Sequence, residues 1–267
     1  MRPPAIIRTN SQFKKAYPNL QKGDVVSCVL NLKPFEEFIF TDLVDRGVLL
    51  FPSAISQIAS RSKCFQAHLL GDLMVPGTRV INGKADLIRA MDDYLQEGTG
   101  PVITKKDRAD CGLGINKWRD CEDLFNNVSL SSNPPWPFVL QPFIPDATDI
   151  RVVWVGSHHR EAYWRKNRAG FRNNLHFGGE SGPFELSDRE AEICQKAMDR
   201  AKFPFAHMDL LMTENGEVFL SEISLFGGTR GAKIDSVECS RLKKLVEEEF
   251  LDQFVGTSLP GTEQGSI

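Results

Sequence analysis

The sequence lacks the features that would place the protein among membrane proteins, zinc-finger proteins or secreted disulfide-rich proteins. Its cysteines occur singly, without the C-x-x-C or Cys/His spacing that binds zinc. It has no run of about 18 apolar residues, as a transmembrane helix needs, and no apolar N-terminal stretch of the signal-peptide type. We therefore expect a cytoplasmic protein with reduced thiols. The six cysteines are Cys28, Cys64, Cys111, Cys121, Cys194 and Cys239.

The chain also lacks an excess of charge of either sign. Its 32 Lys and Arg residues and 35 Asp and Glu residues give a formal net charge of -3. We therefore expect neither nucleic acid nor a membrane surface as a partner. At 267 residues, 41% of them hydrophobic, the chain is long enough to bury a core as one large domain or a few small lobes.

The first half of the chain alternates between strand and helix patterns. Short apolar runs bounded by turn residues predict strands, and apolar residues at helical spacing predict the helices between them. This alternation is typical of an α/β architecture. The predicted strands lie near residues 24–31, 47–51, 78–81 and 101–105, and the predicted helices near residues 35–46, 53–73 and 85–97.

The second half predicts two hairpins joined by a helix. Between residues 139 and 166, the runs IRVVWV and REAYWR flank a Gly-Ser-His-His turn, which indicates a hairpin. Ser187-x-x-Glu190 is a capping-box pattern that opens a helix ending before Pro204. The remaining predicted elements are a hairpin over 205–224, an amphipathic helix over 237–254 and a disordered polar tail over 256–267.

Asn215-Gly216 is a strong hairpin signal and predicts a two-residue turn that fixes the register of both strands. In that register Asp209 lies directly opposite Glu222 on one face of the hairpin. The same register pairs His207 with Ser224, and Leu211 with Leu220.

Two carboxylates opposite each other repel unless a cation lies between them or one of them is protonated. Magnesium is the simplest cation to propose, because it takes a few carboxylate oxygens and leaves its other positions to water and phosphate. The alternative is a hairpin whose acids simply reach solvent. The segment alone leaves both interpretations open.

A loop follows the predicted strand that ends at Lys105. Its Gly112 and Gly114 allow backbone N–H groups to approach phosphate oxygens, while the lysine supplies positive charge. The Gly-Lys-Ser/Thr ending of a Walker motif is missing. On this segment alone, a mobile surface turn is the favoured alternative.

A second loop, over residues 165–179, concentrates basic side chains. Planar guanidinium groups in a polar loop suit phosphate or carboxylate recognition. In isolation, a solvated charged face is the favoured alternative. The basic residues are Arg165, Lys166, Arg168, Arg172 and His176.

In this order, the segments resemble the ATP-grasp superfamily, and most closely its RimK-like and glutathione-synthetase-like carboxylate-amine ligases. The resemblance covers about residues 47–235. It implies an α/β ATP-grasp fold whose two lobes close on ATP. SRSKCFQAHLL resembles the helix with the first phosphate-binding lysine, here Lys63, and VITKK the strand with the second, Lys105. FVLQPFI, residues 138–144, resembles the hinge that holds adenine.

The stretches 149–156 and 171–179 resemble specific segments of the RimK-like branch. The resemblance implies that Arg165 offsets charge on the transferred phosphoryl group, and that Arg172 and Asn174 shape the acid site. It assigns nucleotide contacts to Lys63, Lys105, Gly112, Gly114, Gln141, Phe143 and Asp146, and binding of Mg²⁺ or Mn²⁺ to Asp209, Glu222 and Ser224.

The sequence departs from the family pattern at three places. Pro142 follows Gln141 where the family usually has an acidic residue, and Asp146 is a substitute for the ribose contact. Ser224 stands where the family has a metal-binding asparagine. The lobe before residue 53 is shorter than is usual, so substrate identity does not transfer.

The resemblance implies an ATP-dependent carboxylate-amine ligase that acts through an acyl phosphate. Its expected partners are small-molecule or peptide carboxylates and amines, with a homo-oligomer left open. The alternatives are a kinase-like ATP-grasp phosphotransferase and a nucleotide-binding protein without turnover. The expected units are a shortened N-terminal lobe over 1–55, a first ATP-grasp lobe over 56–138, a second over 139–255 and the tail over 256–267.

Overall fold

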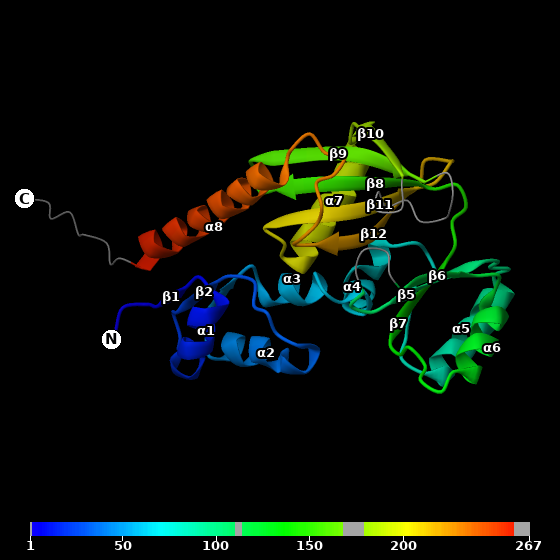
Figure 1. Cartoon of the computed structure of the whole chain (residues 1–267), viewed down its shortest axis with the longest axis horizontal. Coiled ribbons are helices and arrows are strands. Elements are labelled where there is room, and N and C mark those ends of the chain that lie inside the picture. The colour runs from blue at the N-terminus through cyan, green and yellow to red at the C-terminus, as the bar shows by residue number, and fades with distance from the viewer. Residues whose placement is uncertain (1, 110–113, 168–178, 259–267) are drawn as a thin grey trace, which may run out of the picture.

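The computed structural model describes residues 2–109, 114–167 and 179–258. These residues form three β-sheets, each with a hydrophobic core of its own (Figure 1). Helices and strands alternate through the first two sheets, so the predicted α/β class is confirmed. Within the described residues, no helix is both long and apolar enough to cross a bilayer.

The N-terminal lobe is built on a parallel sheet of three strands in the order β1-β2-β3. Parallel neighbours need crossover connections, which the helices of this lobe provide. The fully buried Val26, Phe40 and Leu43 lie in its core. Its elements are β1 (Ile6–Ile7), α1 (Asn10–Ala16), η1 (Tyr17–Asn19), β2 (Val25–Ser27), η2 (Pro34–Glu36), α2 (Phe38–Asp45) and β3 (Leu49–Phe51).

The predicted helix over 53–73 is wrong, because this segment forms three short helices. The Ser62 hydroxyl accepts a hydrogen bond from the Phe65 N–H at 3.0 Å, so the chain is capped and starts a new helix there. Lys63 is consequently the first residue of a helix and lies beside the cap. The three helices are α3 (Ala54–Ala59), α4 (Lys63–Leu70) and η3 (Gly71–Leu73).

The second sheet has four antiparallel strands in the order β4-β7-β5-β6, with α5 and α6 packed against it (Figure 1). Because β7 pairs with β4 and β5, the predicted lobe boundary after residue 138 falls inside a strand. Its elements are β4 (Arg79–Ile81), α5 (Lys84–Gln96), β5 (Val102–Lys106), β6 (Ile115–Trp118), α6 (Cys121–Leu130) and β7 (Phe138–Pro142).

The third sheet has five antiparallel strands in the order β10-β9-β8-β11-β12. Both predicted hairpins are confirmed as β8–β9 and β11–β12. One face buries Ile150, Met208 and Ile223 in a core that includes apolar residues of α7, while the alternate positions include the polar side chains of Asp149, Arg151 and Asp209. Its elements are β8 (Thr148–Val155), β9 (His159–Lys166), β10 (Glu180–Phe184), α7 (Asp188–Ala201), β11 (Phe205–Met212) and β12 (Val218–Ser224).

The last helix, α8 (Ser236–Ser258), extends from the third sheet to the N-terminal lobe (Figure 1). Glu248 on α8 accepts hydrogen bonds from the Arg8 guanidinium, and Glu247 accepts one from the Ser27 hydroxyl at 2.8 Å. Because α8 continues through Ser258, the predicted tail begins too early at Gly256. Residues 259–267 lie outside the described residues.

Candidate functional site

The predicted register of the β11–β12 hairpin is confirmed for the half of the hairpin that carries the two acids. Asp209 lies opposite Glu222, and His207 opposite Ser224. The predicted pairing of Leu211 with Leu220 is wrong. The register shifts by one residue between Asp209 and Leu210, so Leu211 lies opposite Phe219.

Two irregularities in the hairpin offset each other. The Thr213 N–H donates to the Glu217 carbonyl at 2.8 Å, so the turn contains three residues instead of two, with Gly216 at a φ of 81°. Ser221 is the extra residue of a bulge on β12, which restores the predicted register. The bulge therefore determines which side chains of β12 point toward the neighbouring lobe.

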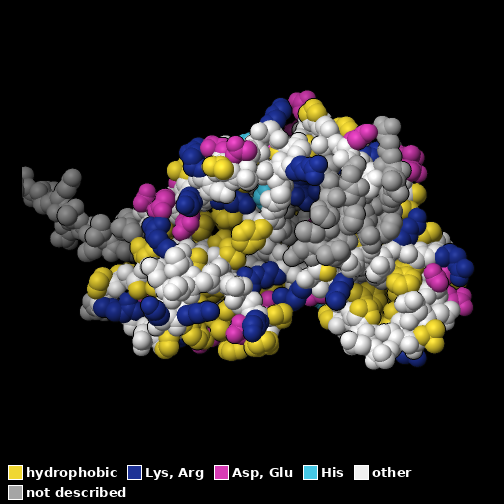
Figure 2. Space-filling model, in the orientation of Figure 1, with side chains coloured by type: hydrophobic (Ala, Val, Ile, Leu, Met, Phe, Trp, Pro, Cys, Tyr) yellow, Lys and Arg dark blue, Asp and Glu magenta, His cyan; other side chains and the backbone are white. Residues whose placement is uncertain are grey.

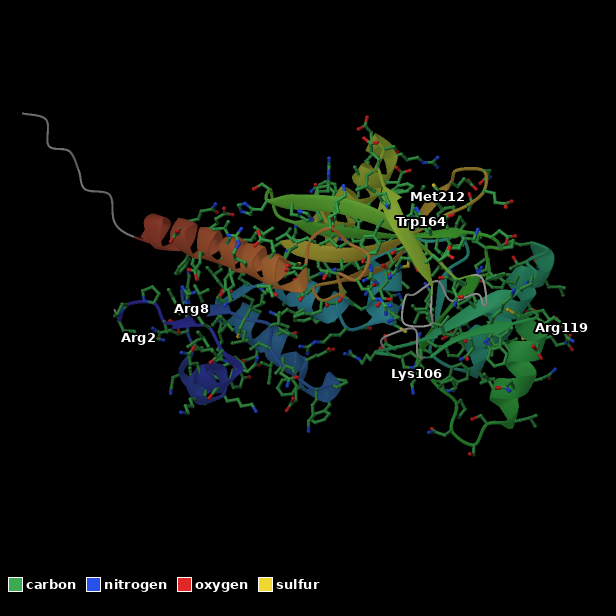
Figure 3. The ribbon with its side chains drawn as sticks, turned by 45° about the horizontal axis from the view of Figure 1, so that its top comes forward. Arg2, Arg8, Lys106, Arg119, Trp164 and Met212 are labelled. Carbon is green, nitrogen blue, oxygen red and sulfur yellow. The ribbon has the colours of Figure 1, made fainter. Side chains whose placement is uncertain are left out.

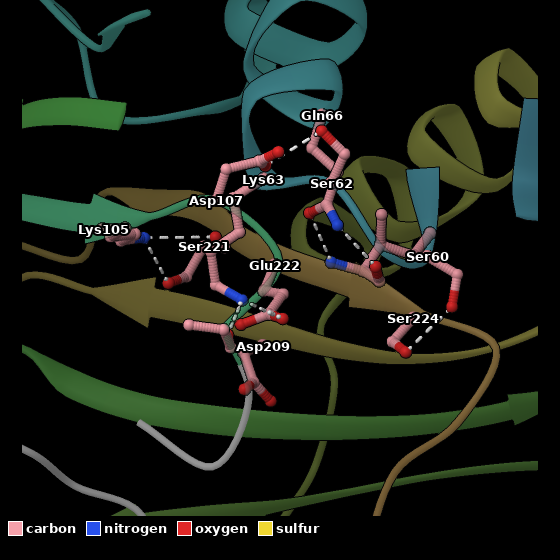
Figure 4. Close-up of polar contacts among 12 residues, drawn as sticks. Ser60, Ser62, Lys63, Gln66, Lys105, Asp107, Asp209, Ser221, Glu222 and Ser224 are labelled. Carbon is pink, nitrogen blue, oxygen red and sulfur yellow. Dashed lines mark hydrogen bonds and ion pairs between the residues drawn. The ribbon is translucent and has the colours of Figure 1, made fainter. Parts of the chain in front are cut away.

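Two buried lysines from other elements converge on this bulge (Figure 4). Lys105, on β5, donates to the Ser221 carbonyl at 3.2 Å and to its hydroxyl at 3.1 Å. Lys63, at the start of α4, donates to Glu222 Oε1 at 3.0 Å and to the Ala109 carbonyl at 2.7 Å. Burial lowers the pKa of Lys105 to about 8, although the negative charge of Glu222 acts in the other direction and raises it.

Asp209 lies between two arginines, one on the adjacent strand β8 and one on β9, the next strand beyond it. Arg151 is directly opposite it on β8 and forms a two-pronged ion pair, with Nη2 at 2.9 Å from Oδ2. Arg165, on β9, reaches the same Oδ2 at 3.0 Å. Burial alone would raise the pKa of Asp209, but the two guanidinium groups outweigh it and hold that pKa below its ordinary value.

Asp149 is the second carboxylate of this cluster. It lies opposite Arg165 and accepts a hydrogen bond from its Nε at 2.6 Å. Burial and the neighbouring charge of Asp209 raise the pKa of Asp149 to about 6, despite Arg165. The predicted repulsion between Asp209 and Glu222 is thus relieved by protein cations, with arginines at Asp209 and Lys63 at Glu222.

The Ser224 hydroxyl already has two hydrogen-bond partners within the protein. Its oxygen lies 3.1 Å from the Ser60 hydroxyl and accepts a hydrogen bond from the Phe226 N–H at 3.1 Å. Its neighbour across the hairpin, His207, is buried, and burial together with the nearby charge of Lys243 lowers the pKa of His207 to about 3. This end of the hairpin therefore carries a neutral imidazole and a hydroxyl with two partners.

The expected hinge residues lie at the end of β7 and just beyond it. Gln141 is buried, and Phe143 donates its backbone N–H to the Pro101 carbonyl at 2.8 Å, so that N–H already has a protein acceptor. Lys117 Nζ lies 3.6 Å from the centroid of the Phe143 ring. Asp146 is exposed and has a φ of 53°.

The two predicted loops are only partly described. Gly114, at a φ of 77°, closes the first loop by accepting a hydrogen bond at its carbonyl from the Lys106 N–H at 2.9 Å. A Cβ at Gly114 would lie 2.7 Å from Lys106 Cβ, so glycine is required there. Gly112, Arg172 and Asn174 lie outside the described residues.

Sequence reasoning missed Asp149 and Arg151, although alternation along the strand places both on the face of the predicted Arg165 and Asp209. Among residues 2–109, 114–167 and 179–258, no group of three or more His, Cys, Asp or Glu side chains is arranged to hold a metal. The donors that suit magnesium are the carboxylates of Asp209 and Glu222, and the side chain of Glu222 is 32% exposed.

A family model described as the RimK-like ATP-grasp domain matches residues 59–238, which contain the lysines, the arginine cluster and the acidic pair. The chain belongs to the RimK-like ATP-grasp family. Solved structures agree on the ATP-grasp fold. A D-alanine--D-alanine ligase from Bacillus anthracis has a TM-score of 0.64 at 13% identity, over 94% of this chain and 87% of that one.

Two curated proteins are similar to this chain in sequence. A probable alpha-L-glutamate ligase of Trichodesmium erythraeum is 25% identical over 181 residues, 67% of this chain and 59% of that protein. A coenzyme gamma-F420-2:alpha-L-glutamate ligase of Methanococcus maripaludis is 26% identical over 165 residues, 60% of this chain and 55% of that protein. The chain thus spans between 55% and 59% of the length of these two relatives.

Proposed function

We propose that this protein is an ATP-dependent carboxylate-amine ligase. The observation that carries the proposal is the convergence of Lys63 and Lys105 on the strand that bears Glu222, beside the Asp209–Arg165 cluster. Buried lysines without a full set of carboxylate partners are costly, and they are suited to a multiply charged ligand such as a nucleotide phosphate chain.

In the proposed complex, phosphate oxygens replace the Ser221 acceptors of Lys105 and the Glu222 acceptor of Lys63, while the Ala109 carbonyl keeps its contact with Lys63. Lys105 donates to a carbonyl and a hydroxyl, both neutral, so an anionic oxygen is a stronger acceptor for it. Lys63 would exchange its contact with Glu222 for a phosphate oxygen, which would free the Glu222 carboxylate.

The freed Glu222 would hold magnesium together with Asp209, which would exchange part of its contact with Arg151 or Arg165 for the ion. Both would bind through carboxylate oxygens, the hard donors that this ion prefers. When bound, magnesium neutralises charge on the nucleotide phosphates. Ser224 would join these ligands only by giving up its contact with Ser60 or Phe226, because its single oxygen serves both. We therefore propose Asp209 and Glu222 as the main ligands.

The proposed reaction has two steps. A substrate carboxylate oxygen attacks the γ-phosphorus of ATP, ADP leaves, and an acyl phosphate forms. The amine nitrogen then attacks the acyl carbon, inorganic phosphate leaves, and the nitrogen loses a proton. Arg165 would stabilise charge on the transferred phosphoryl group, and Arg172 and Asn174 are proposed to contact the acid. The names of the two relatives make glutamate the first amine to test.

A screen of carboxylates with glutamate and other amino acids, read out as magnesium-dependent ADP release, tests the proposal. We expect one acid–amine pair to raise ADP release well above that of either compound alone, and Glu222→Gln to abolish the increase. The engaged hydroxyl of Ser224 favours one alternative, nucleotide binding without turnover. ATP that binds but is not converted to ADP with any pair would support that alternative.

A further inference from the structure

An ion pair joins the N-terminal lobe to the segment that follows β5. Arg108 Nη1 lies 2.8 Å from Glu37 Oε1, and Arg108 Nη2 lies 2.8 Å from Glu37 Oε2. The side chains are 29% and 18% exposed, respectively. A partly buried guanidinium and carboxylate in this parallel two-bond arrangement form one of the stronger polar contacts available to a protein.

The Glu37 end of this pair is firmly supported. The chain just before it is held by Gln57, whose Oε1 accepts from the Leu30 N–H at 2.7 Å, and by Arg61, whose Nη1 donates to the Leu32 carbonyl at 3.0 Å. Glu37 then leads directly into α2. The N-terminal lobe therefore presents the carboxylate from a fixed position.

The Arg108 end lies within a segment that holds Lys63. Asp107 Oδ1 accepts from the Ser62 hydroxyl at 2.9 Å and from the Cys64 N–H at 3.0 Å, while the Ala109 carbonyl accepts from Lys63 Nζ at 2.7 Å. Arg108 itself has a φ of 56°, a conformation that is unfavourable for a non-glycine residue and needs support from its surroundings. The contact with Glu37 provides such support.

We propose that Glu37 and Arg108 are positioning residues for Lys63. The pair fixes Arg108 in its left-handed conformation, and this places the Ala109 carbonyl where it orients the Lys63 ammonium group. The inference rests on the proposed function, in which Lys63 binds nucleotide phosphate. Glu37 lies outside the matched residues 59–238, so the short N-terminal lobe contributes to nucleotide binding through this contact.

The test compares the dissociation constants of a non-hydrolysable ATP analogue and of adenosine for the wild type, Glu37→Gln and Arg108→Gln. We expect each variant to bind the analogue roughly fivefold to tenfold more weakly, within the range for coupling between contacting residues. The double variant should be no worse than either single variant, because both remove the same contact. Adenosine, which lacks phosphates, should bind all forms equally.

Arg8→Gln is the matched control, because Arg8 also forms a two-pronged ion pair that holds the N-terminal lobe, in its case to Glu248 on α8. Arg8 lies far from Lys106, which is two residues before Arg108 in the chain (Figure 3). We expect Arg8→Gln to bind the analogue as the wild type does. The exchange of charges in Glu37→Arg with Arg108→Glu should restore most of the affinity.

Equal affinity of the wild type, Glu37→Gln and Arg108→Gln for the analogue would overturn the inference and leave the proposed function standing. An equal loss in Arg8→Gln, or an equal loss of adenosine binding, would also overturn it, because the pair would then act through lobe docking or general stability. A wild type that does not bind the analogue would overturn the proposed function and this inference with it.

Discussion

Replacing Lys105 by Met is expected to stabilise the nucleotide-free protein while weakening nucleotide binding. The pKa of Lys105 lies near 8 instead of 10.5, mainly because burial removes water from the ammonium group. This difference corresponds to about 3 kcal/mol against the charged form. The two hydrogen bonds to Ser221 are worth about 1 kcal/mol each, and the variant loses both. We therefore expect the free energy of unfolding to rise by about 1 kcal/mol near pH 7.

The effect should depend on pH with a defined sign. Between pH 8 and 10.5 the unfolded wild type retains the proton on Lys105 and the folded protein does not, so the stability of the wild type rises with pH in this range. The variant has no such group. Its advantage should therefore shrink as the pH rises through 8, vanish at about pH 9 and be reversed above that.

Urea unfolding of both proteins without nucleotide, near pH 7 and near pH 9.5, measures these differences. Lys106→Met is the matched control, because Lys106 is the exposed neighbour on β5 and should change neither stability nor nucleotide affinity. If Lys105→Met is less stable than the wild type by the same amount at both pH values, Lys105 is a well-paired cation and the desolvation argument is refuted.

Three further predictions concern the acidic strand pair. Glu222→Gln should reduce magnesium-dependent ATP turnover by about a hundredfold while the protein remains folded, with a lower melting temperature because Lys63 loses its charged partner. Glu217→Gln at the exposed turn should leave both turnover and melting temperature intact. Asp209→Asn should lower the free energy of unfolding by about 3 kcal/mol in urea titrations, because Arg151 loses its buried partner; an unchanged midpoint would contradict this. In magnesium titrations of turnover, Ser224→Asn should lower the half-maximal concentration and Ser224→Ala should raise it, and identical curves would show that Ser224 is no ligand.

The acidic pair was predictable from the sequence because strand alternation and the hairpin signal depend only on local chemistry. Asp209 faces Glu222 as predicted, yet this agreement depends on a three-residue turn and a bulge at Ser221 that offset each other. The turn lengthens because Thr213 pairs with Glu217. The Thr213 N–H donates to the Glu217 carbonyl, and the Thr213 hydroxyl accepts from the Glu217 N–H, a pairing that the Asn-Gly pattern does not reveal.

The cations that neutralise the acids were harder to predict. Arg151 was within reach of sequence reasoning, because it lies on a predicted strand two residues from Asp149. Which carboxylate it would meet depends on the pairing of β8 with β11, two strands that are distant in the sequence. The side-chain partner of Ser224 is Ser60, and this contact follows only from how α3 packs near the end of β12.

The contact between Glu37 and Arg108 is of the same kind. Neither the sequence around Glu37 nor the sequence around Arg108 indicates that the two residues meet. The notch between the N-terminal lobe and the four-stranded lobe is likewise a feature of the folded surface alone (Figure 2). Such contacts between lobes come from tertiary packing and lie beyond local patterns.

Trapping of an acyl phosphate tests the central claim most directly. The protein is incubated with ATP, magnesium and a panel of carboxylates in the presence of hydroxylamine, which intercepts an acyl phosphate as a stable hydroxamate. We predict a hydroxamate from at least one carboxylate, formed in equal amount with ADP and absent with Glu222→Gln. In a parallel incubation that also contains a panel of alcohols, ADP formed together with a stable phosphorylated alcohol, and without hydroxamate from any carboxylate, would contradict the ligase and identify a phosphotransferase.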